Sequence, residues 1–340
     1  MDLKEALAHL VEGRDLEQEQ ARATFHLVMS GEASPTQIAA LLTALRMKGE
    51  TAAELAGATQ AMRTLSTKVE VDAPHLVDTC GTGGSGIKLF NISTAAAFVV
   101  AAAGASVAKH GNRKMTSFSG SADVLEAAGV NIQLTPDQIA HCIREVGVGF
   151  LFAQAHHRAM RHAASVRQEI GFRTMMNVLG PMTNPAGTKR QVLGVFSADW
   201  QRTMAEVLQR LGSEHVMVVH SRGLDELSLD GPSSVVELQL GQIEHYELVP
   251  EDVGLTTTPV DELRATDADT SLNLMKQALT RPNSPAAEIV ALNAGAAIYV
   301  SGVATSLANG VMMAQDAIAS GLAEERLKEL ARVSALMAEA

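Results

Sequence analysis

The chain has 340 residues, enough for one large domain or for a large domain with a smaller companion. Its formal net charge is −11 at pH 7, and aromatic side chains make up only 3% of it. Such a chain repels polyanions and offers little surface for base stacking, which argues against nucleic acid and anionic membranes as partners. Its longest apolar run, residues 95–105, is shorter than the roughly 20 residues of a membrane span. With two cysteines and no signal-peptide pattern, we expect a cytoplasmic protein.

Helix-capping signals fill the first part of the chain, up to about residue 65, and predict an all-helical unit. One helix is expected from about Asp15 to Gly31. A capping box with proline at the first helical position, residues 34–37, opens a second helix that ends near Gly49. Thr51 opens a third. These short helices leave apolar faces to bury, so the unit is expected to pack against a neighbouring domain or a second subunit.

From about His75 the pattern changes to strands that alternate with helices. This alternation predicts an α/β domain with a mainly parallel central sheet flanked by helices. A hairpin is expected at residues 235–248, and three helices are expected to close the chain. The expected strands are 76–79, 106–109, 192–196 and 215–219, and the expected helices begin at 93, 121, 135 and 200 and span 286–300, 304–319 and 323–337.

A glycine-rich loop, residues 81–86, directly follows the first of these strands. Glycines let the backbone approach an anion closely, and the next helix, which begins near Asn91 to Thr94, offers free N–H groups and hydroxyls to a phosphate. The loop lacks the Lys-Ser/Thr ending of a P-loop and fits the dinucleotide spacing poorly. Taken alone, it could equally be a tight turn.

A second loop, residues 109–121, gathers basic groups and hydroxyls after the next strand. Three cations, Lys109, Arg113 and Lys114, stand close together in a chain that is otherwise acidic. Cations and hydroxyls suit a polyphosphate, whereas the alternative is a solvated basic loop. Ligands of open α/β sheets collect at the carboxyl ends of strands, where we expect both loops to meet.

Two adjacent carboxylates, Asp225 and Glu226, follow the strand that ends near His220. Alone they indicate a polar turn, but beside a polyphosphate site they are the ligands that Mg²⁺ prefers. Three histidines at positions 156, 157 and 162 invite a zinc interpretation. No cysteine or carboxylate completes a ligand set at the right spacing, so packed or surface histidines are the preferred interpretation.

Taken together, these segments closely resemble the anthranilate phosphoribosyltransferase family. The resemblance is carried by residues 78–94, 109–129, 147–186 and 224–228, and the combination of residues 81–84, 91–94, 109–113 and 177–185 is highly specific. It implies a nucleoside phosphorylase/phosphoribosyltransferase-like fold. In that fold a helical domain, residues 1–68, is completed by a segment near 167–185 and joined to an α/β domain, residues 69–340. It also implies a homodimer through the helical domain and a place in tryptophan biosynthesis.

The resemblance further implies two substrates, phosphoribosyl pyrophosphate (PRPP) and anthranilate, and Mg²⁺ as cofactor. Anthranilate would meet Asn112 and Arg167, with His110 and His157 lining its path. Lys109, Asp225 and Glu226 would be the catalytic residues, and Ser93, Asp225 and Glu226 would serve Mg²⁺. PRPP would be held by Gly81, Gly84, Ser85, Asn91, Ser93, Thr94, Lys109, Ser117 and Ser121.

Several positions depart from the family pattern. Ser85 stands where the family usually has aspartate, and the stretch before Asp225 is one residue shorter than usual. Met176 replaces a usual phenylalanine, and Gln154 and Ser165 replace usual prolines. The first two departures lie nearest the implied substrate and metal sites.

The implied chemistry is consistent with these residues. Loss of pyrophosphate from PRPP leaves oxocarbenium-like charge on the sugar, and Lys109 with Mg²⁺ would neutralise the charge that grows on pyrophosphate. An aromatic amine is neutral at pH 7, so no strong general base is needed. Two alternatives stay open, namely a nucleoside phosphorylase-like enzyme that uses phosphate and a nucleobase, and a non-catalytic homologue that binds nucleic acid.

Overall fold

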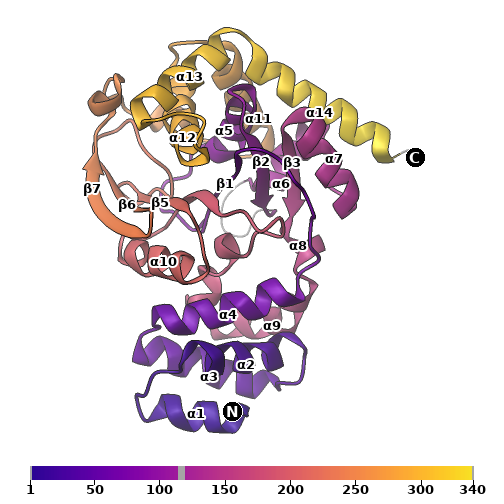
Figure 1. Ribbon diagram of the computed structural model, residues 1–340, viewed down its shortest axis with the longest axis vertical. Coiled ribbons are helices and arrows are strands. Elements are labelled where there is room, and N and C mark those ends of the chain that lie inside the picture. The colour runs from indigo at the N-terminus through magenta and orange to yellow at the C-terminus, as the bar shows by residue number, and fades with distance from the viewer. Residues whose placement is uncertain (1, 114–118, 339–340) are drawn as a thin grey trace.

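The computed structural model describes residues 2–113 and 119–338 of the chain. Figure 1 shows a helical unit at one end of the molecule and a larger α/β unit above it. The fold class expected from the sequence is confirmed, including the all-helical N-terminal part. No helix among the described residues is long and apolar enough to cross a membrane.

Four helices build the N-terminal unit: α1 (Leu3–Val11), α2 (Gln18–Met29), α3 (Pro35–Lys48) and α4 (Ala52–Leu65). The capping boxes expected at Ser34 and Thr51 are present, with each side chain accepting the N–H three residues on. The sequence analysis names no helix before residue 15, although Asp2 and Glu5 form a capping box that opens α1. The helix expected from Asp15 begins instead at Gln18.

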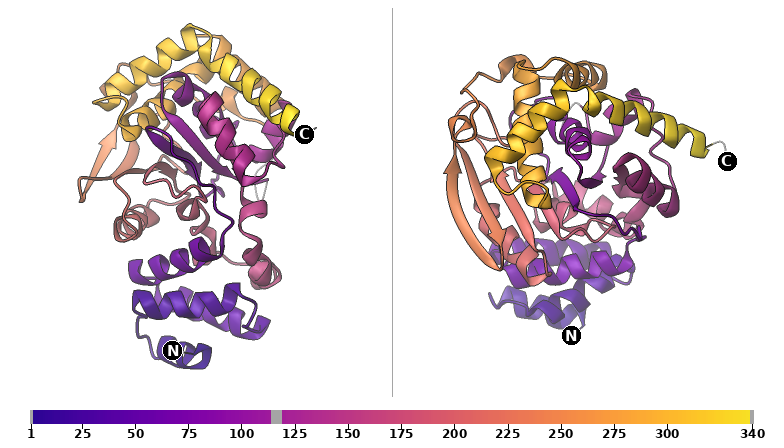
Figure 2. Two further views of the ribbon diagram at one scale, coloured as in Figure 1. Left: turned by 45° about the vertical axis from the view of Figure 1, so that its right-hand side comes forward. Right: turned by 45° about the horizontal axis from the view of Figure 1, so that its top comes forward.

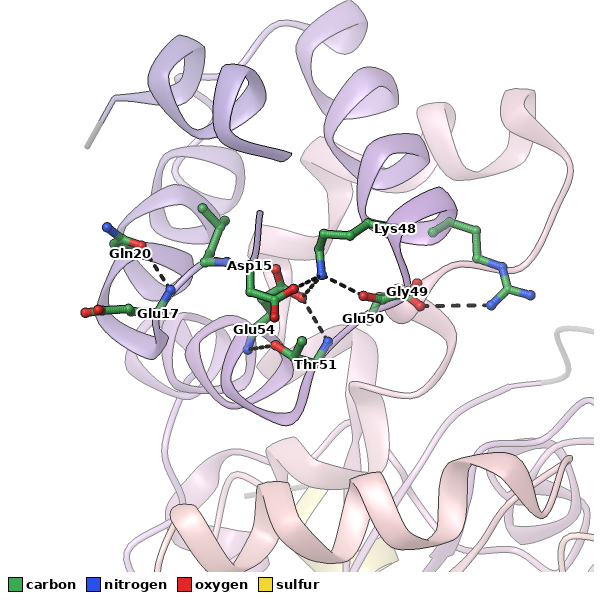
Figure 3. Close-up of polar contacts among 10 residues, drawn as sticks. Asp15, Glu17, Gln20, Lys48, Gly49, Glu50, Thr51 and Glu54 are labelled. Atoms are coloured by element: carbon green, nitrogen blue, oxygen red, sulfur yellow. Dashed lines mark hydrogen bonds and ion pairs between the residues drawn. The ribbon is translucent and has the colours of Figure 1, made fainter. Parts of the chain in front are cut away.

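Asp15 precedes α2 and takes part in an ion-pair cluster with Lys48 and the buried Glu54 (Figure 3). The ammonium group of Lys48 lies 2.6 Å from the Asp15 carboxylate and 3.1 Å from that of Glu54. Glu54 is fully buried and also accepts the backbone N–H groups of Leu16 and Thr51. Removing one partner of such a pair would leave an uncompensated buried charge, so the cluster fixes how α2, α3 and α4 pack.

The sheet has seven strands in the order β3-β2-β1-β4-β5-β6-β7. The first five in this order are parallel, and β6 and β7 form the expected antiparallel hairpin. No strand was predicted at β3, where a glycine interrupts a short apolar run. The strands are β1 (Leu76–Gly81), β2 (Ser106–Gly111), β3 (Val148–Phe152), β4 (Arg190–Gly194), β5 (His215–His220), β6 (Ser233–Gln239) and β7 (Gln242–Leu248).

Helices cover both faces of the sheet (Figure 2). On one face α5 and α12 pack against β1 and its neighbours, while on the other α10 lies between the sheet and α4. The three closing helices lie close to their expected ranges, whereas α11 is not anticipated. The helices that follow the N-terminal unit in the chain, of which α9 packs against α2 and α3, are α5 (Ile92–Ala102), α6 (Ser121–Ala127), α7 (Pro136–Val146), α8 (Ala153–His156), α9 (Arg161–Ile170), α10 (Asp199–Arg210), α11 (Ala268–Thr280), α12 (Pro285–Ser301), α13 (Leu307–Ala319) and α14 (Leu322–Ala338).

Two large apolar cores meet at the sheet, one on each face. Val192 and Met217 face the core of α5 and α12, whereas Leu193 and Val218 face the other. The second core is continuous with the interior of the helical unit and also takes up buried residues from the segment 163–182, including Met176. Since this segment packs with α1–α4 and then runs beside the sheet, the two units are joined through buried apolar surface.

Candidate active site

A cleft of about 370 Å³ opens at the carboxyl ends of the parallel strands. The loops after β1, β2, β4 and β5 meet there, as expected for an open α/β sheet. The cleft therefore brings together both loops and the carboxylate pair that the sequence singles out. Its lining consists of residues 80–85, 87–94, 109–113, 119–121 and 224–226 together with Arg167, Arg173, Asn177 and Phe196.

The glycine loop is held closely against the carboxylate pair. Gly83 and Gly84 have φ values of +65° and +75°, which favour glycine, and the Gly83 N–H donates to Oδ2 of Asp225 at 2.9 Å. Gly81 pairs with Gly194 across β1 and β4. A Cβ atom at Gly194 would lie 1.6 Å from the Asp225 carbonyl oxygen, so only glycine permits this approach.

Ser85 lines the cleft but uses its hydroxyl within the loop. Its Oγ donates to the carbonyl oxygen of Ile87 at 3.0 Å. The shortened stretch before Asp225 forms a tight turn, in which Arg222 and Gly223 have φ values of +41° and +87°. Both values are positive, as in a type I′ turn, and Arg222 adopts a conformation that side chains rarely take. The family departures at these positions thus reshape loops that face the cleft.

The start of α5 presents polar groups to the cleft. Asn91 does not cap the helix with its side chain, because its Oδ1 accepts the hydroxyls of Ser119 and Ser271 at 3.1 and 2.7 Å. The Ser93 N–H donates to Oε1 of Glu226 at 3.2 Å. Thr94 is buried, and its Oγ1 has no hydrogen-bond partner among the described residues. A helix N-terminus with spare donors is a ready anion site.

Lys109 is only 3% exposed and lies at the centre of the cleft floor. Its ammonium group donates to the carbonyl of Thr79 and lies 3.4 Å from Oγ of Ser93. Burial lowers the pKa of Lys109, and the nearby Asp78 and Glu226 carboxylates oppose this. The expected basic residue therefore sits at the phosphate end of the cleft with acidic neighbours around it.

Asp78 is a fully buried carboxylate beneath Lys109 that the sequence analysis does not single out. Its Oδ1 accepts the backbone N–H of His110 at 3.1 Å, and its Oδ2 accepts the side-chain amide of Asn184 at 2.8 Å. Burial raises the pKa of Asp78, while the charge of Lys109 lowers it. An acid inside the apolar strand β1 is the signal that sequence inspection could have used.

Glu226 and Asp225 are adjacent, and the negative charge of Asp225 disfavours ionisation of Glu226. Burial, together with Asp225, raises the pKa of Glu226 to about 8. Lys109 and the Ser93 N–H act in the opposite direction. No three histidine, cysteine or acidic residues converge within the described part of the chain. Two carboxylates and a hydroxyl are a donor set that fits Mg²⁺, which completes its shell with substrate oxygens and water.

His110 lines the cleft, whereas His157, expected beside it on the path of anthranilate, is not among the lining residues and packs against His110. The rings of His110 and His157 lie edge to face with centroids 5.1 Å apart. Burial lowers the pKa of both, that of His157 to about 4, so both rings are neutral at pH 7. Nε2 of His110 has no hydrogen-bond partner among the described residues. His156 points elsewhere, because its Nδ1 lies 2.8 Å from the Thr67 carbonyl.

The basic loop differs from the three converging cations expected there. Arg113 lines the cleft, but its guanidinium group forms ion pairs with Asp123 and Glu126. Lys114 and Ser117 lie outside the described residues. Asn112 and Ser121 do meet, since the Ser121 hydroxyl donates to the Asn112 carbonyl at 3.3 Å. The expectation that Arg113 offers a free positive charge to a ligand is therefore wrong.

Arg167 projects from α9 into the cleft, as expected for a substrate contact. It is half-buried, and burial lowers its pKa. It forms no ion pair with any described residue. Three further lining residues, Arg173, Asn177 and Phe196, were not predicted as site residues. Asn177 opens the motif that carries the resemblance and Phe196 ends the strand expected at 192–196, but neither position indicated a contact with the cleft.

Comparison with known proteins assigns both parts of the chain. Residues 4–66 match a model of a glycosyl transferase family helical bundle domain, and residues 73–324 match its a/b domain. A relative from Saccharophagus degradans named anthranilate phosphoribosyltransferase is 57% identical over 99% of this chain and 100% of its own length. The chain belongs to the anthranilate phosphoribosyltransferase family.

Solved members of this family have the same fold. The Thermus thermophilus enzyme has a TM-score of 0.92 at 44% identity, covering 97% of this chain and 99% of its own. The Saccharomyces cerevisiae enzyme in complex with PRPP and Mg has a TM-score of 0.88 at 24% identity, covering 98% of both chains. A second curated family member, from Hahella chejuensis, is 55% identical over 100% of this chain and 99% of its own.

We predict that Gly194→Ala lowers the melting temperature of the protein, because the added methyl group collides with the backbone of Asp225. Overpacking of this kind costs about 1–3 kcal/mol. Differential scanning calorimetry measures the effect. Gly180→Ala is the matched control, since open space surrounds its added methyl group. Equal melting temperatures for the two variants would contradict the close approach of β4 and the Asp225 loop.

Proposed function

We propose that this chain transfers the phosphoribosyl group of PRPP to anthranilate, giving N-(5-phosphoribosyl)anthranilate and pyrophosphate in tryptophan biosynthesis. The observation that carries the proposal is the convergence of Lys109, Ser93 and Glu226 at the cleft floor beside the glycine loop. The relatives named for this activity cover the full chain. The two domains are residues 1–68, completed by 167–185, and 69–340.

PRPP occupies the phosphate end of the cleft in this proposal. The N-terminus of α5 and the glycine loop offer backbone N–H groups, and Lys109 supplies a positive charge that is already desolvated. Desolvation strengthens the interaction with the departing pyrophosphate. The donor-binding residues are Gly81, Gly84, Ser85, Asn91, Ser93, Thr94, Lys109, Ser121 and, outside the described residues, Ser117.

Mg²⁺ is held by Ser93, Asp225 and Glu226, together with oxygens of PRPP. When bound, it supplies positive charge to the pyrophosphate leaving group. The protein keeps both carboxylates in place through the backbone N–H groups of Gly83 and Ser93. The tight turn at Arg222 and Gly223 holds the loop that carries them.

Anthranilate occupies the part of the cleft lined by Arg167, Asn112 and His110, with His157 packed against His110 on its path. The guanidinium group of Arg167 binds its carboxylate, and the neutral His110 ring faces its aromatic ring. Arg167 thereby aims the uncharged amine at the anomeric carbon of PRPP, so that most of the rate gain comes from orientation and from charge stabilisation.

We also propose that the chain works in the cytoplasm as a homodimer joined through the helical domain. Two apolar side chains at the ends of helices in this domain support the interface, since Val11 is 73% and Met47 is 84% exposed.

A fluorescence assay tests the proposed activity. Anthranilate is fluorescent, and we expect its signal to fall when the protein, PRPP and Mg²⁺ are combined, with pyrophosphate released in equal amount. Chelation of Mg²⁺ should stop the reaction. Phosphorolysis of thymidine or uridine in the same preparation, with no use of anthranilate, would instead support the nucleoside phosphorylase alternative.

We predict that Asp225→Asn combined with Glu226→Gln abolishes turnover and leaves the chain folded, because both residues hold cation and donor while Asp78 still faces the Lys109 charge. Initial rates at saturating Mg²⁺ measure the effect. The control removes two exposed charges by Glu262→Gln with Asp269→Asn and should keep full activity. Undiminished turnover of the first variant would remove both carboxylates from the mechanism.

We predict that Arg167→Ala raises the KM for anthranilate about 10- to 100-fold and leaves the KM for PRPP nearly unchanged, because one charged hydrogen bond is lost. Steady-state kinetics with each substrate varied in turn measure both constants. Arg161→Ala on the same helix is the control, since Arg161 is exposed and does not line the cleft. An unaltered anthranilate KM would show that Arg167 has another role.

A further inference from the structure

Arg173 reaches from the segment after α9 to the glycine loop on the other side of the cleft. Its Nη2 donates to the Gly84 carbonyl oxygen at 2.8 Å, and its guanidinium carbon lies 4.1 Å from the centroid of the Phe196 ring. These partners come from the loops after β1 and β4. The contact joins a segment that packs with the helical unit to the proposed phosphate end of the cleft.

Gly84 is needed for this contact. A Cβ atom there would lie 3.3 Å from Nη2 of Arg173, and its φ of +75° disfavours any side chain. A guanidinium group has five N–H donors in a rigid fork, and the Gly84 carbonyl accepts from one nitrogen of Arg173. The guanidinium group lies over the Phe196 ring and belongs to a side chain that lines the cleft, so it keeps N–H donors beyond the one used by Gly84.

The charge of Arg173 has no acidic counterpart nearby. Lys109, in contrast, is close to Asp78 and Glu226, and Arg113 is ion-paired. Arg173 lies within ion-pair distance of no carboxylate among the described residues. The adjacent loop position that could supply one is Ser85, whose hydroxyl donates to the Ile87 carbonyl.

We propose that Arg173 is a donor-binding residue, whose guanidinium group binds a phosphate oxygen of PRPP at the outer end of the glycine loop. Residue 85 is serine, whereas the family usually has aspartate there. Because no carboxylate at position 85 pairs with Arg173, its charge is available to the donor. This assignment rests on the proposed function and adds a contact on a segment tied to the helical domain.

A purely structural role of Arg173 predicts a different result for its variants. If Arg173 only fastens the glycine loop through the Gly84 carbonyl, any side chain with an N–H donor should partly replace it. If its charge binds the donor, a lysine should replace it better than a glutamine. Arg173→Gln keeps an N–H donor and removes the charge, while Arg173→Lys keeps the charge.

Isothermal titration calorimetry with PRPP, and separately with pyrophosphate, in the presence of Mg²⁺ tests the proposal without turnover. We expect Arg173→Gln to weaken both ligands about tenfold, as for a lost charged hydrogen bond, and Arg173→Lys to stay within about threefold of the parent. The KM for anthranilate should not change. Arg210→Gln removes an equivalent exposed charge on α10 and should bind like the parent.

A second experiment uses the Ser85→Asp variant. The new carboxylate would lie beside Arg173 and pair with it, so Arg173→Gln should weaken PRPP less in the Ser85→Asp background than in the parent. A double-mutant cycle on the PRPP dissociation constants measures this coupling. Additive effects would show that residue 85 does not control the charge of Arg173 and would overturn that part of the proposal.

Three results separate the possible failures. If Arg173→Gln binds PRPP as tightly as the unaltered protein, Arg173 does not bind the donor. If the lysine and glutamine variants weaken PRPP binding equally, Arg173 only holds the glycine loop in place, and the proposal is again overturned. If the unaltered chain binds neither PRPP nor pyrophosphate, the proposed function itself fails, and the assignment of Arg173 fails with it.

Discussion

A buried ammonium group organises this site. Lys109 is withdrawn from water at the end of β2, and a charge in such a place is tolerable only with close partners. Asp78 within β1 and Glu226 in the loop after β5 provide them, and the Thr79 carbonyl and Ser93 hydroxyl accept its hydrogen bonds. The loop after β5 lies so close to the end of β4 that the Asp225 carbonyl leaves room only for glycine at position 194.

The carboxylate that faces Lys109 also connects the site to the rest of the molecule. Asp78, which faces Lys109, also accepts a hydrogen bond from Asn184, which directly follows the segment 163–182 that shares its core with the helical unit. Arg167 and Arg173 belong to this segment, which lies between β3 and β4 in the chain. The cleft is thus built from two sides, with the α/β domain carrying the glycine loop and the carboxylates and the shared segment carrying the arginines.

The sequence sufficed for the fold class and for most elements, because strands such as β5 are valine-rich runs and helices such as α12 open with a serine cap and a proline. It failed at β3, where a glycine interrupts a short apolar run, and at the start of α2, where Asp15 pairs with Lys48 and the helix begins at Gln18. Within the site, motif residues such as Lys109 and Glu226 do meet in one cleft. Contacts between residues distant in the sequence could not be inferred. These are the ion pair of Arg113 with Glu126, the charge interaction of Lys109 with Asp78 and the hydrogen bond from Arg173 to the Gly84 carbonyl.

The most direct test of this account is a crystal structure of the protein with PRPP and Mg²⁺ bound. The account predicts that the pyrophosphate group lies at the N-terminus of α5, within hydrogen-bond distance of the Lys109 ammonium group, with Mg²⁺ between it and the carboxylates of Asp225 and Glu226. Pyrophosphate bound away from Lys109, or Mg²⁺ bound without either carboxylate, would contradict the central role given to this buried cation.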